Sequence, residues 1–205
     1  MVWQPDYVTV EELRGFLRIT DTEDDAELTL AIAAASRAVD THCHRQFGLL
    51  TGPEARYYTA RWSRELGRWY VDIDDLMTTV GLVVNADLAD DGTYTDLIDE
   101  LALRPVNAAA KARPWTRIVV HPTSAHHPNG RDAAVEVVAR FGWTTVPTEV
   151  KEAALLQASR FGARRDSPYG VAGSPELGSE VRLARRVDPD VAVSLTGVIR
   201  WWAAA

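Results

Sequence analysis

The residue types that support catalysis occur in this sequence, but their spacing matches no known reaction centre. Ser174 lies in Gly170-Val-Ala-Gly-Ser-Pro-Glu-Leu-Gly178, which lacks the Gly-x-Ser-x-Gly turn of a serine nucleophile. Neither Gly-x-Gly-x-x-Gly nor Gly-x-x-x-x-Gly-Lys-Ser/Thr occurs, so no phosphate-binding loop is predicted. A hydrolase that uses His126, His127 and nearby carboxylates remains one hypothesis, which a His126→Ala, His127→Ala double variant tests.

Metal and thiol chemistry are also disfavoured. Cys43 is the single cysteine, which excludes a Cys-cluster metal site and an intramolecular disulfide and fits a reducing compartment. His42 and His44 lie about 200° apart on a predicted helix, so they cannot chelate one ion together. The segment 87–92 fails as a calcium loop, because Ala89 and Ile98 occupy ligand positions. We therefore expect no catalytic, metal or cofactor-binding residue, and no cofactor.

The composition is that of an ordinary globular chain with an acidic balance. It has 205 residues, 46% of them hydrophobic and 25% charged, and a formal charge of −7. These values exclude a wholly disordered chain. An acidic protein is also a poor candidate for wrapping nucleic acid, since phosphate binding needs a basic face. The sequence has no visible signal peptide and no apolar run long enough to span a membrane, so no membrane partner is expected.

Both ends of the chain have helical patterns. Thr9-Val-Glu-Glu12 is a capping box that starts a short first helix. A second helix is predicted from about 23 to 45, with an apolar stripe at three- or four-residue spacing that includes Cys43 as a buried small residue. A third helix is predicted from Pro147 to about Arg164, with a stripe that ends at Phe161. Asp188-Pro189 opens a last helix that is expected to end near Trp201-Trp202.

The middle of the chain has the pattern of β-strands. Short runs rich in β-branched and aromatic residues are separated by Gly, Pro, Asn and Asp. The six predicted strands are 56–59, 68–73, 81–84, 101–104, 116–121 and 134–140. Asp91-Gly92 is expected to form a type I′ hairpin turn between Val84 and Tyr94. The tryptophans of this segment are expected in its core, whereas Trp201 and Trp202 are expected to be interface residues.

These patterns together predict an α+β fold. Residues 1–53 and 147–205 are expected to form a helical bundle, and residues 54–146 a small antiparallel β domain inserted into it. The charge is uneven: counting Lys, Arg, Asp and Glu gives −5 for 1–53, −3 for 54–146 and +1 for 147–205. An acidic first part and a slightly basic last part can attract each other within one chain or between copies.

Candidate interface residues gather near the C-terminal end of the sequence. The Gly/Pro/Ser-rich loop 166–178 carries Tyr169 and Leu177, and loops of this length usually bind something. Tryptophan is a typical interface anchor, which favours Trp201 and Trp202. The cluster of Arg182, Arg185 and Arg186 supports an alternative function, a DNA-binding or packaging accessory protein that contacts phosphates. Salt-dependent binding of duplex DNA would favour that alternative.

Three stretches resemble the head–tail connector family of long-tailed bacteriophages, also called adaptor or head-completion proteins. The first is Val8-Thr-Val-Glu-Glu-Leu-Arg-Gly-Phe-Leu-Arg-Ile19 followed by Asp24-Asp-Ala-Glu-Leu28. The second is Arg140-Phe-Gly-Trp143 with Val146-Pro-Thr-Glu-Val-Lys-Glu-Ala153. The third is Arg164-Arg-Asp-Ser-Pro-Tyr-Gly170 with the later helix 188–200. The β domain is larger than in the shortest members of the family.

The resemblance implies a structural, non-enzymatic role in the virion, at the head–tail junction, for a chain made in the host cytoplasm. Such proteins form a ring, usually of twelve copies, that docks under the portal protein and extends the DNA channel. The ring offers an attachment surface to the tail terminator or another tail-side connector protein. Genomic DNA passes through it without sequence-specific binding. We therefore assign the following residues to an interface with the portal or a neighbouring copy: Arg164, Arg165, Tyr169, Leu177, Arg182, Arg185, Arg186, Trp201 and Trp202.

Overall fold

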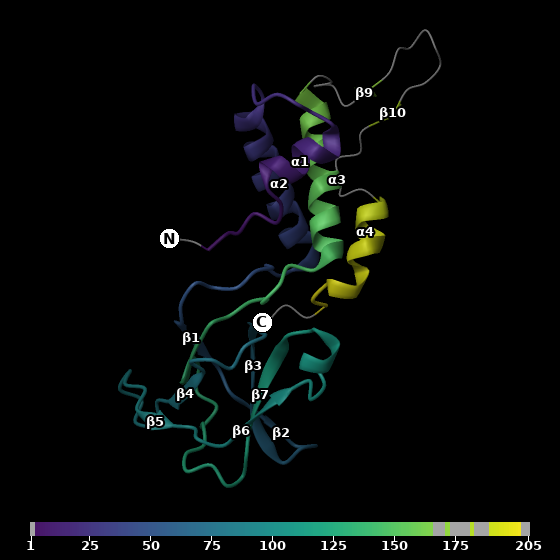
Figure 1. The fold of residues 1–205 in the computed structure, drawn as a ribbon. Coiled ribbons are helices and arrows are strands. Elements are labelled where there is room, and N and C mark those ends of the chain that lie inside the picture. The colour runs from purple at the N-terminus through teal and green to yellow at the C-terminus, as the bar shows by residue number, and fades with distance from the viewer. Residues whose placement is uncertain (1–2, 166–170, 173–180, 183–188, 202–205) are drawn as a thin grey trace. The chain divides into compact units, whose positions relative to one another are not determined.

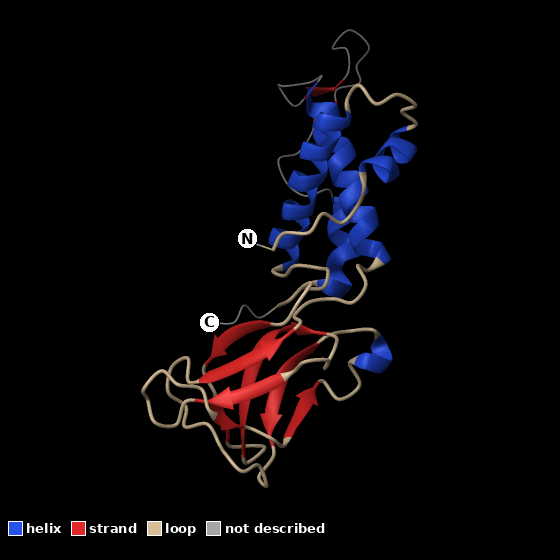
Figure 2. Cartoon of the chain, turned by 60° about the vertical axis from the view of Figure 1, so that its left-hand side comes forward, coloured by secondary structure: helices blue, strands red, loops and turns tan. Residues whose placement is uncertain are grey.

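The computed structural model describes residues 3–165, 171–172, 181–182 and 189–201. The chain divides into a helical unit, built from residues up to 47 and from 146 onward, and a β unit of residues 48–145. Figure 2 shows helices in the first unit and antiparallel sheets in the second. The chain is therefore mixed α+β, as the sequence predicts.

Four α-helices make up the described part of the helical unit (Figure 1). They are α1 (Val10–Leu17), α2 (Asp25–Cys43), α3 (Thr148–Arg165) and α4 (Pro189–Leu195), and a short 3-10 turn, η3 (Thr196–Val198), follows α4. The helix α3 packs along α2, and both α1 and α4 pack against α3. None of the helices in the described ranges is long and apolar enough to cross a membrane.

Helix α1 begins at the predicted capping box. The Thr9 hydroxyl accepts a hydrogen bond from the Glu12 backbone N–H at 3.2 Å, and the Thr9 N–H donates to the Glu12 carboxylate at 2.8 Å. The side chain of each residue thus accepts a hydrogen bond from the backbone N–H of the other, at the start of the helix where N–H groups lack helical partners. Arg18, in the left-handed conformation with a φ of 60°, ends the helix.

The core of the helical unit forms where the predicted stripes of α2 and α3 meet. Small residues on both helices, Ala35 on α2 and Ala154 and Ala158 on α3, are fully buried. Small side chains let helix axes approach closely, which explains why Ala-rich helices form this core. Cys43 is buried as predicted, and burial raises the pKa of its thiol to about 12. The thiol is therefore protonated and poorly nucleophilic near neutral pH.

The segment before α1 is fastened to α2 by hydrogen bonds. The Tyr7 hydroxyl donates to the Asp40 carboxylate and accepts from the Phe47 N–H at 2.9 Å. The Tyr7 N–H donates to the Ser36 hydroxyl at 3.2 Å. These hydrogen bonds join residues that are far apart in sequence. They therefore hold the segment before α1, which is not helical, against α2.

The last helix is shorter than predicted. The sequence pattern predicts a helix that reaches Trp201-Trp202, but α4 ends at Leu195 and continues only as the turn η3. Gly197 weakens the helix at this point, and Ile199 is extended, with a φ of −64° and a ψ of 137°. The Arg200 N–H then bonds to the Cys43 carbonyl at the end of α2, at 2.9 Å. A tertiary hydrogen bond thus takes the place of another helical turn.

The β unit contains two four-stranded sheets. The strands are β1 (Glu54–Tyr58), β2 (Arg61–Ser63), β3 (Arg68–Leu76), β4 (Val83–Ala86), β5 (Asp96–Leu97), β6 (Leu101–Arg104), β7 (Trp115–Val120) and β8 (Val135–Ala139). Their order is β1-β8-β4-β5 in one sheet and β2-β3-β7-β6 in the other, and every pair is antiparallel. The six predicted strands are present. The strands β2 and β5 were not predicted, because two or three residues are too few to show a period.

The hairpin prediction at Asp91-Gly92 is correct in its pairing but wrong in its turn. Strands β4 and β5 pair antiparallel, and Gly92 has a positive φ of 80°. However, the connection runs from 87 to 95 rather than through a two-residue type I′ turn. The Asp87 carboxylate accepts from the N–H groups of Asp90, Asp91 and Gly92 at 2.7–3.3 Å. This side chain organises a longer loop that backbone turn rules do not anticipate.

The prediction that the tryptophans of the β segment are core residues is confirmed for Trp143 and wrong for Trp62. Trp143 is buried, and its indole N–H donates to the Asp75 carboxylate at 2.7 Å. Trp62 is 51% exposed and packs edge-on against Trp69, with ring centroids 5.4 Å apart. Trp62 belongs to β2, an edge strand, so no further strand covers its side chain.

Candidate protein–protein interface

Among the predicted interface residues, the structure describes the side chain of Trp201. This side chain is 74% exposed. The residue before it is fixed, because the Arg200 N–H bonds to the Cys43 carbonyl and the Arg200 side chain is buried. An exposed indole on an anchored backbone loses little conformational entropy on binding, which suits an interface anchor. Val193 on α4 is equally exposed at 74%.

Of the other predicted interface residues, three lie in elements that the structure describes. Arg164 and Arg165 end α3, and Arg182 lies in β10 (Val181–Arg182), which pairs antiparallel with β9 (Val171–Ala172). The remaining ones lie outside the described residues: Tyr169, Leu177, Arg185, Arg186 and Trp202. For all of these the interface role stays a prediction.

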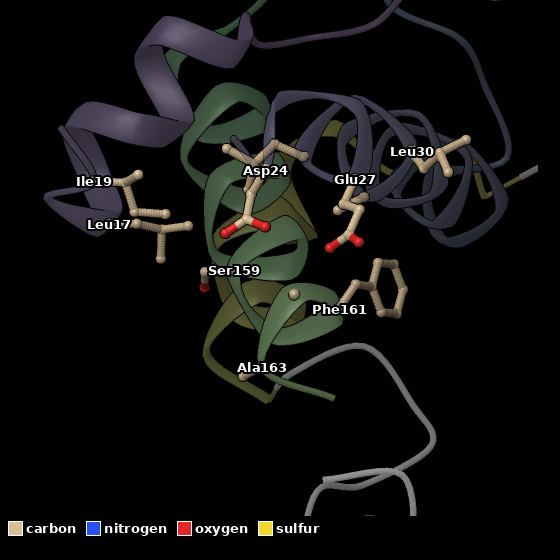
Figure 3. Close-up of a pocket in the computed structure, with 11 residues that line it drawn as sticks. Leu17, Ile19, Asp24, Glu27, Leu30, Ser159, Phe161 and Ala163 are labelled. Carbon is tan, nitrogen blue, oxygen red and sulfur yellow. The ribbon is translucent and has the colours of Figure 1, made fainter. Parts of the chain in front are cut away.

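The structure adds a surface that the sequence analysis missed, a hollow of about 640 Å³ in the helical unit. We call it the α2–α3 hollow. It lies between the end of α1, the first half of α2 and the last turns of α3 (Figure 3). Its lining residues are Leu17, Ile19, Asp24, Glu27, Leu28, Leu30, Ala31, Ser159, Phe161, Gly162 and Ala163.

Apolar side chains make up most of this surface, and two carboxylates stand beside them. Leu30 is 71% exposed, which is unusual for leucine in the middle of a helix. Figure 3 shows the carboxylates of Asp24 and Glu27 pointing from α2 toward the side where Ser159 and Phe161 lie. The α2–α3 hollow therefore combines exposed hydrophobic side chains with two carboxylates, and exposed apolar surface is typical of interaction sites.

Two ion pairs hold the walls of the α2–α3 hollow in place. Arg14 of α1 pairs with Asp25 at 3.5 Å and donates to the Asp21 carbonyl at 3.2 Å, which fixes the turn between α1 and α2. Lys151 of α3 pairs with Glu12 of α1 at 3.4 Å. The Thr9 N–H, followed by Lys151, lowers the pKa of Glu12 below its usual range, so this carboxylate stays charged at neutral pH.

No sequence signal marks the α2–α3 hollow directly. Leu28 and Leu30 are two residues apart, so they point to different sides of one helix. Leu28 is buried in the stripe that packs in the core, whereas Leu30 is 71% exposed. An apolar residue that falls off the buried stripe of an amphipathic helix is the signal that could have found this surface.

Two histidines of the β unit, His126 and His121, have structural contacts. The His126 Nδ1 lies 3.0 Å from the Leu97 carbonyl oxygen and its Nε2 lies 3.7 Å from the Asp96 carboxylate. His121, Thr123 and Glu100 form a further cluster, with the Thr123 hydroxyl 2.7 Å from the His121 Nδ1 and hydrogen-bonded to Glu100. The Thr123 and Ser124 N–H groups bond back to His121, so this cluster fastens a turn after β7. Within the described residues no group of three potential metal ligands occurs.

A protein-family model and a solved structure are similar to this chain. Residues 7–64 match the model of the Phage gp6-like head-tail connector protein family. A solved structure described as the neck of an empty GTA particle, computed with C6 symmetry, has a similar fold, with a TM-score of 0.55 and 20% sequence identity. The match covers 92% of this chain and 97% of that one. No curated protein matches the chain. The match over residues 7–64 confirms the resemblance that the sequence shows to the phage head–tail connector family.

Proposed function

We propose that this chain is a subunit of a connector ring at the head–tail junction of a tailed phage particle. The observation that carries the proposal is the connector-family match over residues 7–64, which spans α1, α2 and the first strands. The neck protein with the same fold over 92% of this chain supports it. In this role the protein holds other proteins together and catalyses no reaction.

The proposed partners are further copies of the chain, the portal protein on the head side and a tail terminator or other tail-side connector. The related neck was computed with C6 symmetry, and a ring of twelve copies contains a sixfold axis. In the proposed subunit, residues 1–53 and 147–205 form a helical bundle with residues 54–146 inserted as the β domain. The helical unit carries the exposed Trp201 and the α2–α3 hollow, so we assign the docking contacts to it.

The acidic charge suits a passage for DNA. Twelve copies, each with a formal charge of −7, carry −84 together. A negative wall repels phosphates, so DNA slides past it instead of binding, although salt screens this repulsion beyond about 8–10 Å. A basic wall would hold the DNA backbone and slow its passage.

Mass spectrometry and electron microscopy of purified particles test the proposal. We expect the chain between the portal and the tail, and its absence from tailed particles would overturn the assigned role. A pair of variants tests the contribution of Trp201. Trp201→Ser is expected to weaken docking by at least about 2 kcal/mol and to leave untailed heads, because aromatic anchors dominate interfaces.

Val80→Ser is the matched control. Val80 is 70% exposed in a loop of the β unit, so both substitutions remove an exposed apolar side chain. We expect the Val80→Ser variant to assemble as the wild type does. Equal assembly by the Trp201→Ser variant would remove Trp201 from the interface.

A further inference from the structure

Two edge strands of the β unit, β2 and β5, lie in segments of opposite charge. Strand β2 ends the sheet β2-β3-β7-β6, and β5 ends the sheet β1-β8-β4-β5. Figure 1 shows them on opposite sides of the β unit. An edge strand has no neighbouring strand on one side, so it is a place where another chain can approach. The side chains around each edge therefore determine which partner fits there.

The hairpin of β2 and β3 has an excess of positive charge. We call residues 61–69 the arginine hairpin; it contains Arg61, Arg64 and Arg68 and a single acid, Glu65. Within the described residues, no hydrogen bond or ion pair joins the three guanidinium groups to a partner. Arginine forms strong, oriented hydrogen bonds with carboxylates and phosphates. Three free arginines on one hairpin therefore favour an anionic partner.

A hollow of about 380 Å³, which we call the tryptophan hollow, lies beside these arginines. Trp62 is 51% exposed, and Trp69 packs edge-on against it. The residues that line the hollow include Trp62, Arg68, Trp69, Val120, Pro122 and His127. Tryptophan and arginine are enriched at the centre of protein–protein interfaces. The phosphates of a DNA duplex would satisfy the arginines but not the apolar hollow, so the hairpin favours an acidic protein surface with an apolar side chain.

The edge at β5 is such a surface. We call residues 87–100 the acidic edge; they include six acidic residues and no Lys or Arg. Leu97 of β5 lies among these acids and is 48% exposed. In the part of the chain that the structure describes, Arg131 is the one Lys or Arg that pairs with them, at 2.7 Å from Asp90. An excess of negative charge therefore surrounds an exposed leucine.

The hydrogen bonds within the acidic edge leave its charge in place. Thr93 bonds to Asp91, and Ala125 and Ser124 bond to Asp99. These bonds lower the pKa of both carboxyls, so both are ionised at neutral pH. The donors are neutral N–H and O–H groups, which do not cancel the negative charge. A carboxylate also has about four lone-pair sites, so one that holds a hydrogen bond can still accept from an arginine.

We infer that the arginine hairpin of one copy binds the acidic edge of a neighbouring copy. Leu97 of the neighbour enters the tryptophan hollow, and Arg61 and Arg64 lie against the carboxylates around it. The inference rests on the proposed function, because a contact between two different surfaces of the same chain can repeat around a ring. This contact joins copies, and it adds to the docking contacts of the helical unit.

Disulfide cross-linking of full-length chains tests the contact. One chain carries Glu65→Cys in the arginine hairpin and the other carries Ala89→Cys in the acidic edge, and both positions are exposed. Cys43 does not interfere, because it is buried. We expect at least about tenfold more mixed dimer than with Ala110→Cys in place of Ala89→Cys, which corresponds to about 1.4 kcal/mol of preference. Ala110 is the matched control because it is an exposed alanine outside both surfaces. A yield no higher than this control would overturn the inference.

A charge swap tests the pairing of the two surfaces. Arg61→Glu with Arg64→Glu, added to the hairpin chain, should lower the yield of mixed dimer about tenfold. Asp91→Arg with Thr95→Arg, added to the other chain, should restore the yield of that reversed pair. Circular dichroism verifies that each variant is folded. Folded variants whose swapped charges do not restore the yield would overturn the inference.

The apolar part of the contact and the DNA alternative have their own measurements. Leu97→Ser should lower the yield of mixed dimer about fivefold, because a half-exposed leucine loses its burial on binding. Val106→Ser is the control, an exposed valine of the β unit outside both surfaces, and it should leave the yield unchanged. Duplex DNA binding that Arg61→Glu with Arg64→Glu abolishes, without any mixed dimer, would assign the arginines to phosphates and overturn the inference.

A chain that carries both Glu65→Cys and Ala89→Cys separates a ring from a closed pair. In purified particles, oxidation should link this chain into a ladder of products longer than a dimer. Particles that contain the chain but yield only dimers, only an intramolecular disulfide or no cross-link would overturn the inference and leave the connector role intact. Particles that lack the chain would overturn the connector role, and cross-linking of the purified chains would then still decide whether the two surfaces bind.

Discussion

At the scale of single residues, Tyr7 does more than any other described side chain to fasten the start of the chain. Its hydroxyl donates to Asp40 of α2 and accepts from the Phe47 N–H, and its ring packs edge-on against Phe47 with centroids 5.7 Å apart. Burial, followed by the hydrogen bond to Asp40, raises the pKa of the Tyr7 phenol, so it remains a neutral donor at any physiological pH. The phenol therefore serves as a structural hydrogen-bond bridge.

Tyr7→Phe is expected to destabilise the helical unit by about 1–3 kcal/mol, because the buried Phe47 N–H loses its hydroxyl acceptor and the part-buried Asp40 carboxylate loses one of its donors. Urea unfolding followed by helical circular dichroism measures this loss. Tyr57→Phe is the matched control, since Tyr57 is 53% exposed, and we expect a change within about 0.5 kcal/mol for it. Equal stability of the two variants would contradict the bridging role.

The raised pKa of Asp40 predicts how the stability of the folded state changes with pH. Burial raises the pKa of Asp40 above its ordinary value of 3.8, although the Tyr7 hydroxyl, Arg37 and Gln46 act in the opposite direction. A raised pKa in the folded state means that protonated Asp40 adds stability below about pH 3.8, and that this stability is lost as the pH rises through the folded-state pKa. Asp40→Asn removes this titration. The stability of the wild type minus that of the variant should therefore fall as the pH rises from 3.5 to 7.

Glu12 provides a control of opposite sign for that measurement. The Thr9 N–H lowers the pKa of Glu12 below its ordinary value of 4.5. Its contribution is therefore present above about pH 4.5 and is lost as the pH falls through the folded-state pKa. The stability of the wild type minus that of Glu12→Gln should rise with pH over the same range. Parallel curves for the two variants would contradict the Asp40 assignment.

At the scale of elements, an added side chain is expected to have opposite effects on stability at two glycines, Gly15 in α1 and Gly130 in a turn of the β unit. Gly15 lies inside α1, and a Cβ built there would meet no atom within 4 Å. Gly15→Ala is expected to stabilise the helical unit by about 0.5–1 kcal/mol, because alanine loses less backbone entropy in a helix. Thermal unfolding measures the gain.

Gly130→Ala is the opposite case in the β unit. Gly130 has a φ of 77°, and an added Cβ would lie 3.1 Å from the Trp69 ring. The left-handed backbone alone costs a side chain at least about 1 kcal/mol. We expect a loss of stability of that size or more, measured as above. A gain in stability for this variant would contradict the cost assigned to the left-handed backbone and to the close approach of Trp69.

Local signals account for what the sequence predicts well. The α1 capping box needs only Thr9 and Glu12, and the α2 stripe needs only spacing, so both are confirmed. Features that depend on distant parts of the chain were missed. The position of Trp62 on an edge strand depends on strand order, and the loop after β4 depends on the Asp87 side chain. The α2–α3 hollow depends on how α1, α2 and α3 meet. The spacing within α2 indicates only that Leu30 falls off the buried stripe.

At the scale of the whole molecule, the helical unit carries two candidate docking surfaces, the α2–α3 hollow and the exposed Trp201. The α2–α3 hollow lies beside the first half of α2, and Trp201 follows Arg200, which is bonded to the last residue of α2. The fifteen helical steps from Leu28 to Cys43 span about 22 Å. Two different surfaces at separate ends of one helix favour contacts with two different partners rather than a symmetric dimer.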